Sequence, residues 1–446
     1  MLKLQRIHTP ITGELTVPGD KSISHRAVML SALADGTSEI TGFLNSGDCI
    51  ATVNCFRSLG IEIEERRTVH GAHVVNVHGQ GLYGFKKAAG TLYTGNSGTT
   101  TRLMAGILAA QPFSSRVTGD ASIENRPMMR IIDPLTKMGA RIKSEHDNGC
   151  CPLLFDGVAP GDMLTGINYH NPVASAQVKS AILLSGLYAE GDTIVHEPAP
   201  SRNHTEVMLR AFGADIRHER THAGTTTSIL HPGDPLRAMK ITIPGDISSA
   251  AFFIAAACLL PDSDLLLKRV GINETRSGIL TVLKQMGADI TVTNEKGGAS
   301  EPYADIRVRY AELHGSPSGP FTIAGKLVPT LIDELPIIAV LAAFVPCITV
   351  IQNAEELRVK ETDRIAAICE NLTAMGCNVD DIKDGMVIYG GDKLHGANIK
   401  TYGDHRIAMA FAIAALAVDG ETTIDDETCV NISYPRFFET LTRLTT

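Results

Sequence analysis

The chain has 446 residues, of which 44% are hydrophobic and 20% charged, with a formal net charge of −9 at pH 7. These values are typical of a globular protein with a large core, and the length predicts roughly two to three domains. The acidic balance, the 5% aromatic content and the lack of tryptophan argue against nucleic acid as a partner. A basic site on such a chain suits a small anionic ligand.

No apolar run reaches about 18 residues, so we expect no membrane span. The first residues lack the apolar stretch of a secretory signal, and the nine cysteines include no C-x-x-C pair. We therefore expect reduced thiols, a cytoplasmic location and no metal site.

The first informative element begins at Pro18, where the chain reads Pro-Gly-Asp-Lys-Ser-Ile-Ser-His-Arg. Lys21, Ser22 and Arg26 precede a helical pattern that begins at Ala27. Cations and hydroxyls at a helix start, where backbone N–H groups are free, favour a phosphate or carboxylate ligand. A capped helix with solvated charges explains this one turn equally well.

Three further polar segments follow in the first half of the chain. Residues 95–102 contain a Gly-Asn-Ser-Gly turn, and an apolar helix is predicted to follow from Leu103. Backbone N–H groups in the turn can approach an anion, although an ordinary helix start also fits. Residues 119–127 place Arg126 in extended backbone before a proline. Residues 174–180 offer a hydroxyl and an amide near a helix start.

Three more polar segments lie in the second half. Asp333 and Glu334 stand in an apolar context, where buried carboxylates require cations or a chemical task. Residues 358–364 read Arg-Val-Lys-Glu-Thr-Asp-Arg between a predicted strand and a predicted helix, although a solvated helix start also fits. Residues 402–409 place an Asp, a His and an Arg before a helix predicted at 408–416.

One pattern recurs five times: an apolar residue, two spacers, an apolar residue, a glycine and a short β-like run. Each copy predicts a helix that ends in a left-handed C′ glycine before a strand. The spacing of 74 to 89 residues is too long for a solenoid and predicts a repeated α/β subdomain. The glycines are Gly60, Gly139, Gly213, Gly287 and Gly376.

A sixth copy at residues 437–444 lacks its strand, whereas residues 9–17 predict a strand without a preceding helix. We therefore expect the chain ends to meet, with residues 1–20 completing the sixth copy. The two Pro-Gly-Asp turns, at residues 18–20 and 244–246, would then be crossings between domains; unrelated turns are the alternative. This predicts one domain of residues 21–240 and another of residues 241–446 with 1–20.

Five runs occur in order between residues 18 and 435: Lys-Ser-x-Ser-x-Arg, Gly-Asn-x-Gly-Thr, x-Arg-Pro, Arg-Val-Lys-Glu-Thr-Asp-Arg and Asp-His-Arg-x-Ala-Met. Together they resemble the 5-enolpyruvylshikimate-3-phosphate synthase family. The resemblance implies an α/β enolpyruvyl transferase fold of two domains, each with three βαβαββ repeats in an inside-out barrel, and an active site in the cleft between them.

The resemblance also implies 3-phosphoshikimate 1-carboxyvinyltransferase activity. The enolpyruvyl group of phosphoenolpyruvate passes to the 5-hydroxyl of shikimate 3-phosphate and phosphate is released, a step of the shikimate pathway towards chorismate and the aromatic amino acids. No cofactor or metal is implied. The family expectation is a monomer that is the target of the inhibitor glyphosate, which competes with phosphoenolpyruvate.

Site residues follow from the match to the family's motifs. Substrates that carry both a phosphate and a carboxylate require many cations and N–H donors. The implied contacts to shikimate 3-phosphate are Ser22, Arg26, Ser175, Gln177, Ser201, Arg202, Asp333 and Lys360, and those to phosphoenolpyruvate are Gly98, Arg126, Gln177, Arg364 and Arg406. Lys21 is implied to touch both substrates, and the substrate-binding positions also include Ala176 and His405.

The implied catalytic residues are Asp333, Glu361 and Lys21. The 5-hydroxyl must lose a proton as it attacks C2 of phosphoenolpyruvate, and C3 must gain one. Asp333, assisted by Lys21, is the implied base, and Glu361 is the implied acid that delivers and later removes the C3 proton.

The chain departs from part of the family at four positions. Ile432 stands where other members carry a lysine that contacts phosphoenolpyruvate, so that contact has no assigned residue. Ala176 replaces a serine, Arg202 replaces a lysine and Leu103 replaces a proline. These changes resemble the more divergent bacterial branch, which includes enzymes of reduced glyphosate sensitivity.

Two other functions are alternatives. The sister enzyme that transfers enolpyruvyl to UDP-N-acetylglucosamine carries a cysteine where this chain has Ala121 and an asparagine where it has Ser22, so both positions argue against it. A non-catalytic binding protein for a phosphorylated metabolite would share the cations but would have no use for Asp333 or Glu361.

Overall fold

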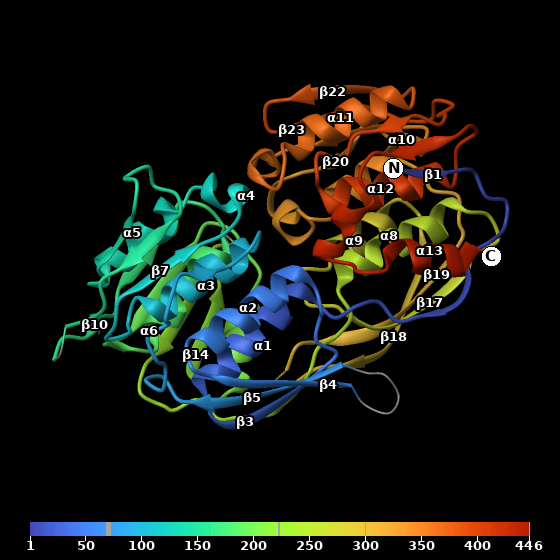
Figure 1. The fold of residues 1–446 in the computed structure, drawn as a ribbon. Helices are drawn as coiled ribbons and strands as arrows, with labels where there is room; N and C mark the ends of the chain where they lie inside the picture. Colours follow the sequence, from blue (N-terminus) through green and yellow to red (C-terminus); the bar gives the residue numbers. More distant parts are fainter. Residues whose placement is uncertain (68–72, 160, 222–223, 299, 446) are drawn as a thin grey trace. The chain divides into compact units, whose positions relative to one another are not determined.

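The computed structural model describes residues 1–67, 73–159, 161–221, 224–298 and 300–445. The chain divides into two compact units, drawn in Figure 1. The 19–243 unit comprises Gly19–Ile243 and Gly297–Glu301; the 244–446 unit comprises Met1–Pro18, Pro244–Lys296 and Pro302–Thr446. Among the described residues, no helix has the length and apolar character needed to cross a membrane.

The 19–243 unit contains three four-stranded sheets of identical topology. In each, the first strand is parallel to the second, and a final hairpin places the fourth strand antiparallel between the second and third. With a helix on either side of the second strand, this is a βαβαββ unit. The strand orders are β16(Lys240–Thr242)-β3(Asp35–Thr41)-β5(His73–Gln80)-β4(Glu62–Arg67), β6(Leu92–Tyr93)-β7(Ser115–Thr118)-β9(Leu153–Phe155)-β8(Ile142–Ser144) and β11(Asn168–His170)-β13(Thr193–Glu197)-β15(Thr226–His231)-β14(Asp215–Arg220). The helices are α1(Lys21–Leu33), α2(Gly47–Ser58), α3(Gly98–Leu108), α4(Ala121–Glu124), α5(Met129–Lys137), α6(Ala176–Gly186) and α7(His204–Ala211), and a small sheet pairs β10(Leu164–Thr165) with β12(Ala189–Glu190).

The 244–446 unit repeats this plan. Its sheets are β2(Thr12–Leu15)-β17(Asp264–Gly271)-β19(Tyr303–Arg309)-β18(Asp289–Lys296), β20(Phe321–Ile323)-β21(Ile348–Ile351)-β23(Gly385–Tyr389)-β22(Asn378–Ile382) and the three-stranded β24(Asn398–Ile399)-β25(Thr422–Ile424)-β1(Leu2–Leu4). Its helices are α8(Ile247–Leu259), α9(Gly278–Gln285), α10(Leu335–Phe344), α11(Arg364–Ala374), α12(His405–Ala415) and α13(Phe437–Thr445), with short 3₁₀ helices η1(Gly325–Thr330), η2(Glu355–Val359) and η3(Thr428–Ile432). The predicted repeat of an α/β subdomain is therefore confirmed.

Two sheets take their first strand from a segment that leads into the other unit. β2 precedes α1 in the chain but pairs in parallel with β17, and β16 precedes α8 but pairs in parallel with β3. The chain passes from one unit to the other just after each of these strands, between Pro18 and Gly19 and between Ile243 and Pro244.

The chain ends meet inside the 244–446 unit, as the sequence predicts, but in a different way. β1 pairs antiparallel with β25 and supplies the last strand of the sixth repeat. The strand expected at residues 9–17 forms as β2 but does not complete that repeat, because it pairs with β17 instead. The sequence prediction was therefore right about the meeting of the ends and wrong about which strand closes the sheet.

Three helices in each unit are buried on nearly every side. They are α1, α3 and α6 in the 19–243 unit and α8, α10 and α12 in the 244–446 unit, and each set lies within a separate hydrophobic core (Figure 1). α12, for example, reads His-Arg-Ile-Ala-Met-Ala-Phe-Ala-Ile-Ala-Ala, and all of its residues are buried. A helix that is apolar all round belongs in a core, with the sheets outside it.

The five repeat glycines lie where the sequence places them. Each is the second residue after a helix, with φ between 86° and 99°, a left-handed conformation that favours glycine. The backbone N–H of the next residue bonds back to the helix, as Ile61 N–H does to the carbonyl of Phe56 at 3.1 Å. A strand follows every one of them: β4, β8, β14, β18 and β22.

Candidate active site

The polar segments lie at helix N-termini, and their helices begin earlier than predicted. α1 begins at Lys21 rather than Ala27, α3 at Gly98 rather than Leu103, and α12 at His405 rather than Ala408. Capping side chains fix these starts: Asp20 accepts from the N–H of Ile23, Ser97 from Thr100 and Asp404 from Arg406, at 2.9, 3.1 and 2.8 Å. The apolar pattern misses these first turns because they are polar.

The buried Arg26 ties three helices of the 19–243 unit together. Its guanidinium donates to the hydroxyl of Thr205 at 2.7 Å, the hydroxyl of Ser180 at 2.9 Å and the carbonyl of Ser22 at 2.9 Å. Burial, the largest influence, lowers the pKa of Arg26 to about 10, which leaves it charged at neutral pH. One turn earlier, the ammonium of Lys21 lies 3.0 Å from a carboxylate oxygen of Asp48.

A second cluster surrounds the start of α3. Arg102 donates to the side-chain oxygen of Gln177 at 2.6 Å, and the amide nitrogen of Gln177 donates to Thr99 at 3.2 Å. A Cβ on Gly98 would lie 3.1 Å from a guanidinium nitrogen of Arg102 and 3.2 Å from one of Arg126. The structure thus brings together Gly98, Arg126 and Gln177, which the sequence assigns, with Arg102, which it does not.

The start of α6 differs from the starts of α1 and α3. In the part of the chain that the structure describes, the side chain of its N-cap residue, Ser175, makes no capping bond. The backbone N–H of Ser175 donates to Glu197 at 3.1 Å, and the hydroxyl of Ser201 donates to the other oxygen of Glu197 at 2.9 Å. The first-turn N–H groups of α6 are consequently not occupied by their own cap, which suits an anionic ligand.

In the 244–446 unit, four cations surround Asp333. Its carboxylate oxygens lie 3.3 Å from Arg364, 3.7 Å from Lys360, 3.7 Å from Arg406 and 3.8 Å from Arg276. Arg406 also donates to the carbonyl of Asp333 at 3.1 Å. The predicted need of this carboxylate for cations is confirmed.

Arg364 links the strand-to-helix junction to α12. Its guanidinium contacts Glu361 at 2.6 Å and Asp404 at 2.7 Å, besides Asp333. Burial alone would lower the pKa of Arg364, but Asp404, Glu361 and Asp333 outweigh it and raise the pKa, so the group stays charged. Glu361 is held beside Asp333 in this way, with a fifth of its side chain exposed.

Glu334, which follows Asp333 in the chain, shares the cations Arg276 and Arg406 with it and was not assigned a role by the sequence. Arg276 reaches Glu334 at 3.4 Å and Asp246 at 3.0 Å, and the hydroxyl of Ser248 donates to Glu334. Burial raises the pKa of Glu334, against the influence of Arg276 and Arg406. The first turns of α8, α10 and α12 are joined through this carboxylate.

Two of the residues assigned to the substrates, Arg364 and His405, have side chains that are almost completely buried. The side chains of Arg364 and His405 are each 1% exposed, and His405 lies 4.0 Å from Asp404. The remaining assigned residues Ser22, Ala176, Arg202 and Lys360 are partly exposed at or near helix starts. The sequence draws attention to Glu334 and Asp404 without giving them a role, and it assigns neither Arg102 nor Arg276. A polar residue within a turn of a helix start is the signal that points to all four.

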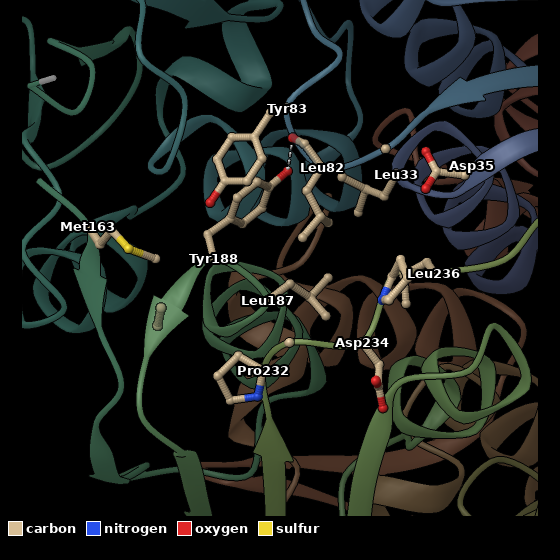
Figure 2. Close-up of a pocket in the computed structure, with 14 residues that line it drawn as sticks. Leu33, Asp35, Leu82, Tyr83, Met163, Leu187, Tyr188, Pro232, Asp234 and Leu236 are labelled. Atoms are coloured by element: carbon tan, nitrogen blue, oxygen red, sulfur yellow. Dashed lines mark hydrogen bonds between the residues drawn. The ribbon is translucent and has the colours of Figure 1, made fainter. Parts of the chain in front are cut away.

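The pocket in Figure 2 lies at the C-terminal ends of α1 and α6, opposite the helix starts that carry the assigned residues. Leu33, the last residue of α1, lines it together with Leu187 and Tyr188, which follow α6. Thirteen residues of α1 separate the two ends by about 20 Å. Because the pocket is mostly apolar and its charged residues are Asp35 and Asp234, it does not suit an anion. On strands β4 and β5, the exposed Glu62 and Glu64 and the half-buried His78 place possible metal-ligand atoms within 4.8 Å of one another.

Cations at helix N-termini oppose the helix dipole, so their clustering there does not serve helix stability. In the 19–243 unit the hydrogen-bond partners of Arg26 and Arg126 are neutral groups, which leaves positive charge for an anion. In the 244–446 unit carboxylates and cations alternate at separations of 2.6 to 3.8 Å, which suits proton transfer. We call these the anion half-site and the carboxylate half-site.

Known proteins agree with this chemistry. A family model described as EPSP synthase (3-phosphoshikimate 1-carboxyvinyltransferase) matches residues 5–441. Proteins named 3-phosphoshikimate 1-carboxyvinyltransferase from Brevibacillus brevis and Desulforamulus reducens are 49% and 48% identical, over 100% and 97% of this chain and 100% and 96% of their own lengths. A solved EPSP synthase structure from Acinetobacter baumannii is 44% identical and matches with a TM-score of 0.86, covering 99% of this chain and 97% of that one.

These matches confirm the resemblance found in the motifs and the two-domain α/β fold that it implies. They extend over nearly the whole chain, so both units are covered rather than one. The chain belongs to the EPSP synthase (3-phosphoshikimate 1-carboxyvinyltransferase) family.

Proposed function

We propose that this chain transfers the enolpyruvyl group of phosphoenolpyruvate to the 5-hydroxyl of shikimate 3-phosphate, with its two half-sites acting on the same pair of substrates in the cleft that the family resemblance implies. The observation that carries the proposal is the pairing of Asp333 and Glu361 with cations at the starts of α11 and α12. The reaction is a step of the shikimate pathway, which leads to the aromatic amino acids.

The anion half-site holds the negative groups of the substrates. Arg26, Ser175 and Ser201 bind shikimate 3-phosphate together with Ser22, Gln177 and Arg202. Gly98 leaves space beside Arg126, so that the guanidinium and the backbone of residues 96–99 receive phosphoenolpyruvate. Lys21, which lies at the start of α1, contributes charge to both substrates.

The carboxylate half-site moves the protons. Asp333 takes the proton of the 5-hydroxyl as the hydroxyl oxygen bonds to C2 of phosphoenolpyruvate. Glu361 gives a proton to C3. The C2–O bond to phosphate then breaks while the Glu361 carboxylate takes a proton back from C3, and the proton held by Asp333 leaves with phosphate. Arg364 touches both carboxylates and keeps them together through these steps.

The chain works as a monomer in the cytoplasm. Both half-sites belong to one chain, so a monomer carries every residue assigned to the substrates. Light scattering at working concentration tests the first statement, and cell fractionation tests the second.

The test of the function is phosphate release with both substrates. We expect release from phosphoenolpyruvate only when shikimate 3-phosphate is present, together with a product that carries both carbon skeletons. Release with UDP-N-acetylglucosamine in place of shikimate 3-phosphate would point to the sister enzyme. Binding of shikimate 3-phosphate without any release would point to a binding protein.

A further inference from the structure

A buried ion-pair cluster lies directly behind the anion half-site, and the steps proposed above do not use it. Lys179, in the second turn of α6, is fully buried; its ammonium lies 2.7 Å from Glu197 and 2.9 Å from Glu206. The side chains of the two acids are 0% and 2% exposed. Buried charges are costly unless they are paired, so the cluster requires a reason.

The two carboxylates bond to different parts of the unit. Glu197 accepts the backbone N–H of Ser175 on one oxygen and the hydroxyl of Ser201 on the other. Glu206 accepts the hydroxyl of Ser228, in β15, at 3.0 Å. Among the described residues, Glu197 hydrogen-bonds to residues assigned to shikimate 3-phosphate, whereas Glu206 acts on one of them, Arg26, through its charge.

We infer that Glu197 is a positioning residue for shikimate 3-phosphate, an inference that rests on the proposed function. Its carboxylate joins the start of α6 to the loop before α7, and so it sets the spacing of Ser175 and Ser201. Lys179 offsets the negative charge of Glu197, which otherwise would repel the phosphate of the substrate.

The electrostatics of the cluster favour the charged forms of Lys179 and Glu206. Burial acts to lower the pKa of Lys179, but Glu206 and Glu197 outweigh it and raise the pKa. Burial acts to raise the pKa of Glu206, but Lys179 outweighs it and lowers the pKa. Glu197 thus keeps a charged partner in Lys179, and its two oxygens accept hydrogen bonds from Ser175 and Ser201.

The test compares Glu197→Gln with Glu206→Gln, because both remove one carboxylate from Lys179 but only the first loosens Ser175 and Ser201. Calorimetry measures the Kd of shikimate 3-phosphate, and steady-state kinetics give the KM of each substrate. For Glu197→Gln we expect the Kd and KM for shikimate 3-phosphate to rise about tenfold or more, as for loss of a charge-assisted hydrogen bond. The KM for phosphoenolpyruvate and kcat should stay within about threefold of the parent. Glu206→Gln should lower the thermal stability as much as Glu197→Gln does. It should leave the Kd of shikimate 3-phosphate within about threefold of the parent value.

Glu197→Asp covers the case in which Glu197→Gln does not fold. It keeps the charge beside Lys179 but draws the carboxylate back by about 1.5 Å, so it cannot hold both serines, and the Kd should again rise. An unchanged Kd in a folded Glu197 variant, or an equal rise in Glu206→Gln, would overturn the inference alone. Absence of shikimate 3-phosphate binding by the parent protein would overturn the proposed function and the inference with it.

Discussion

Lys21 is the first residue of α1, where its charge opposes the helix dipole and where it contacts Asp48. We expect Lys21→Met to fold, with a loss of about 1–3 kcal/mol because Asp48 is left without its ammonium. Turnover should fall about 100-fold or more, since a preorganised charge at the reacting atoms is lost. Phosphate release and thermal unfolding, measured on the same preparation, check both expectations.

Lys240→Met is the matched control for this change. Lys240 is 88% exposed and lies 3.9 Å from Glu39 on the outer face of the sheet, so its loss should alter neither turnover nor stability. If Lys21→Met kept turnover within about threefold of the parent, Lys21 would not act on the substrates.

Gly98 separates two guanidinium groups, and a methyl group there would crowd both. The Cβ of an alanine would lie 3.1 and 3.2 Å from Arg102 and Arg126, so both side chains would have to shift by a few tenths of an ångström. Glyphosate, which is longer than phosphoenolpyruvate, should lose about 1–3 kcal/mol of binding by overpacking, and phosphoenolpyruvate less.

Gly98→Ala should accordingly raise the inhibition constant of glyphosate by a larger factor than the KM for phosphoenolpyruvate. The ratio of the two constants is the measurement, because the parent protein has Ile432 where other family members carry a lysine. An equal rise in both constants would place Gly98 away from the discriminating end of the inhibitor.

The sequence reveals those site residues that stand in motifs and misses those that act through long-range contacts. Asp333 and Glu361 could be named because their runs are specific to the family. Arg276 lies 57 residues before Asp333 in the chain, and nothing local indicates that it meets Glu334 and Asp246. Such contacts follow from the convergence of helix starts, which only the packing of three buried helices creates.

Among the elements, the helices of the anion half-site differ in how they are capped. Ser97 caps α3 by accepting from the N–H of Thr100, whereas the side chain of Ser175 makes no capping bond to α6 among the described residues. We expect Ser97→Ala to cost about 0.5–2 kcal/mol of stability, as for other N-cap losses. Ser175→Ala should cost less than that but should weaken the binding of shikimate 3-phosphate.

Denaturant unfolding and calorimetry of the two variants check this difference. The pair serves as its own control, because the same substitution is made at the same cap position of two neighbouring helices. A full capping cost at Ser175 with unchanged substrate binding would show that Ser175 is an ordinary cap residue.

The end of a helix could be predicted where its conformation requires a particular residue type. The start of a helix could not be predicted where the first turn is polar and so lies outside the apolar pattern. The five C′ glycines mark helix ends because a left-handed residue is needed there. The starts of α1, α3 and α12 were placed too late because their first turns are polar. The pairing of β2 with β17 and of β16 with β3 could not be foreseen, because strand pairing is decided by contacts between segments distant in the chain.

At the scale of the whole molecule, the residues assigned to the reaction are divided between the two units. The anion half-site belongs to the 19–243 unit, and the carboxylate half-site, with Asp333 and Glu361, belongs to the 244–446 unit. A substrate that is bound by both half-sites at once would stabilise those conformations of the chain in which both half-sites can contact it. Shikimate 3-phosphate is that substrate in the proposed function, since its assigned contacts include Arg26 in one unit and Lys360 in the other.

We therefore expect shikimate 3-phosphate to draw the two units together, because its anionic groups offset the like charges of Arg26 and Lys360. Small-angle scattering should give a smaller radius of gyration with saturating shikimate 3-phosphate than without ligand, and a further decrease with glyphosate added. Shikimate, which lacks the phosphate, is the matched control and should leave the radius nearer its unliganded value at equal concentration. Calorimetry under the same conditions establishes that the phosphorylated ligand is bound. A radius that does not change at proven saturation would mean that binding does not bring the units together.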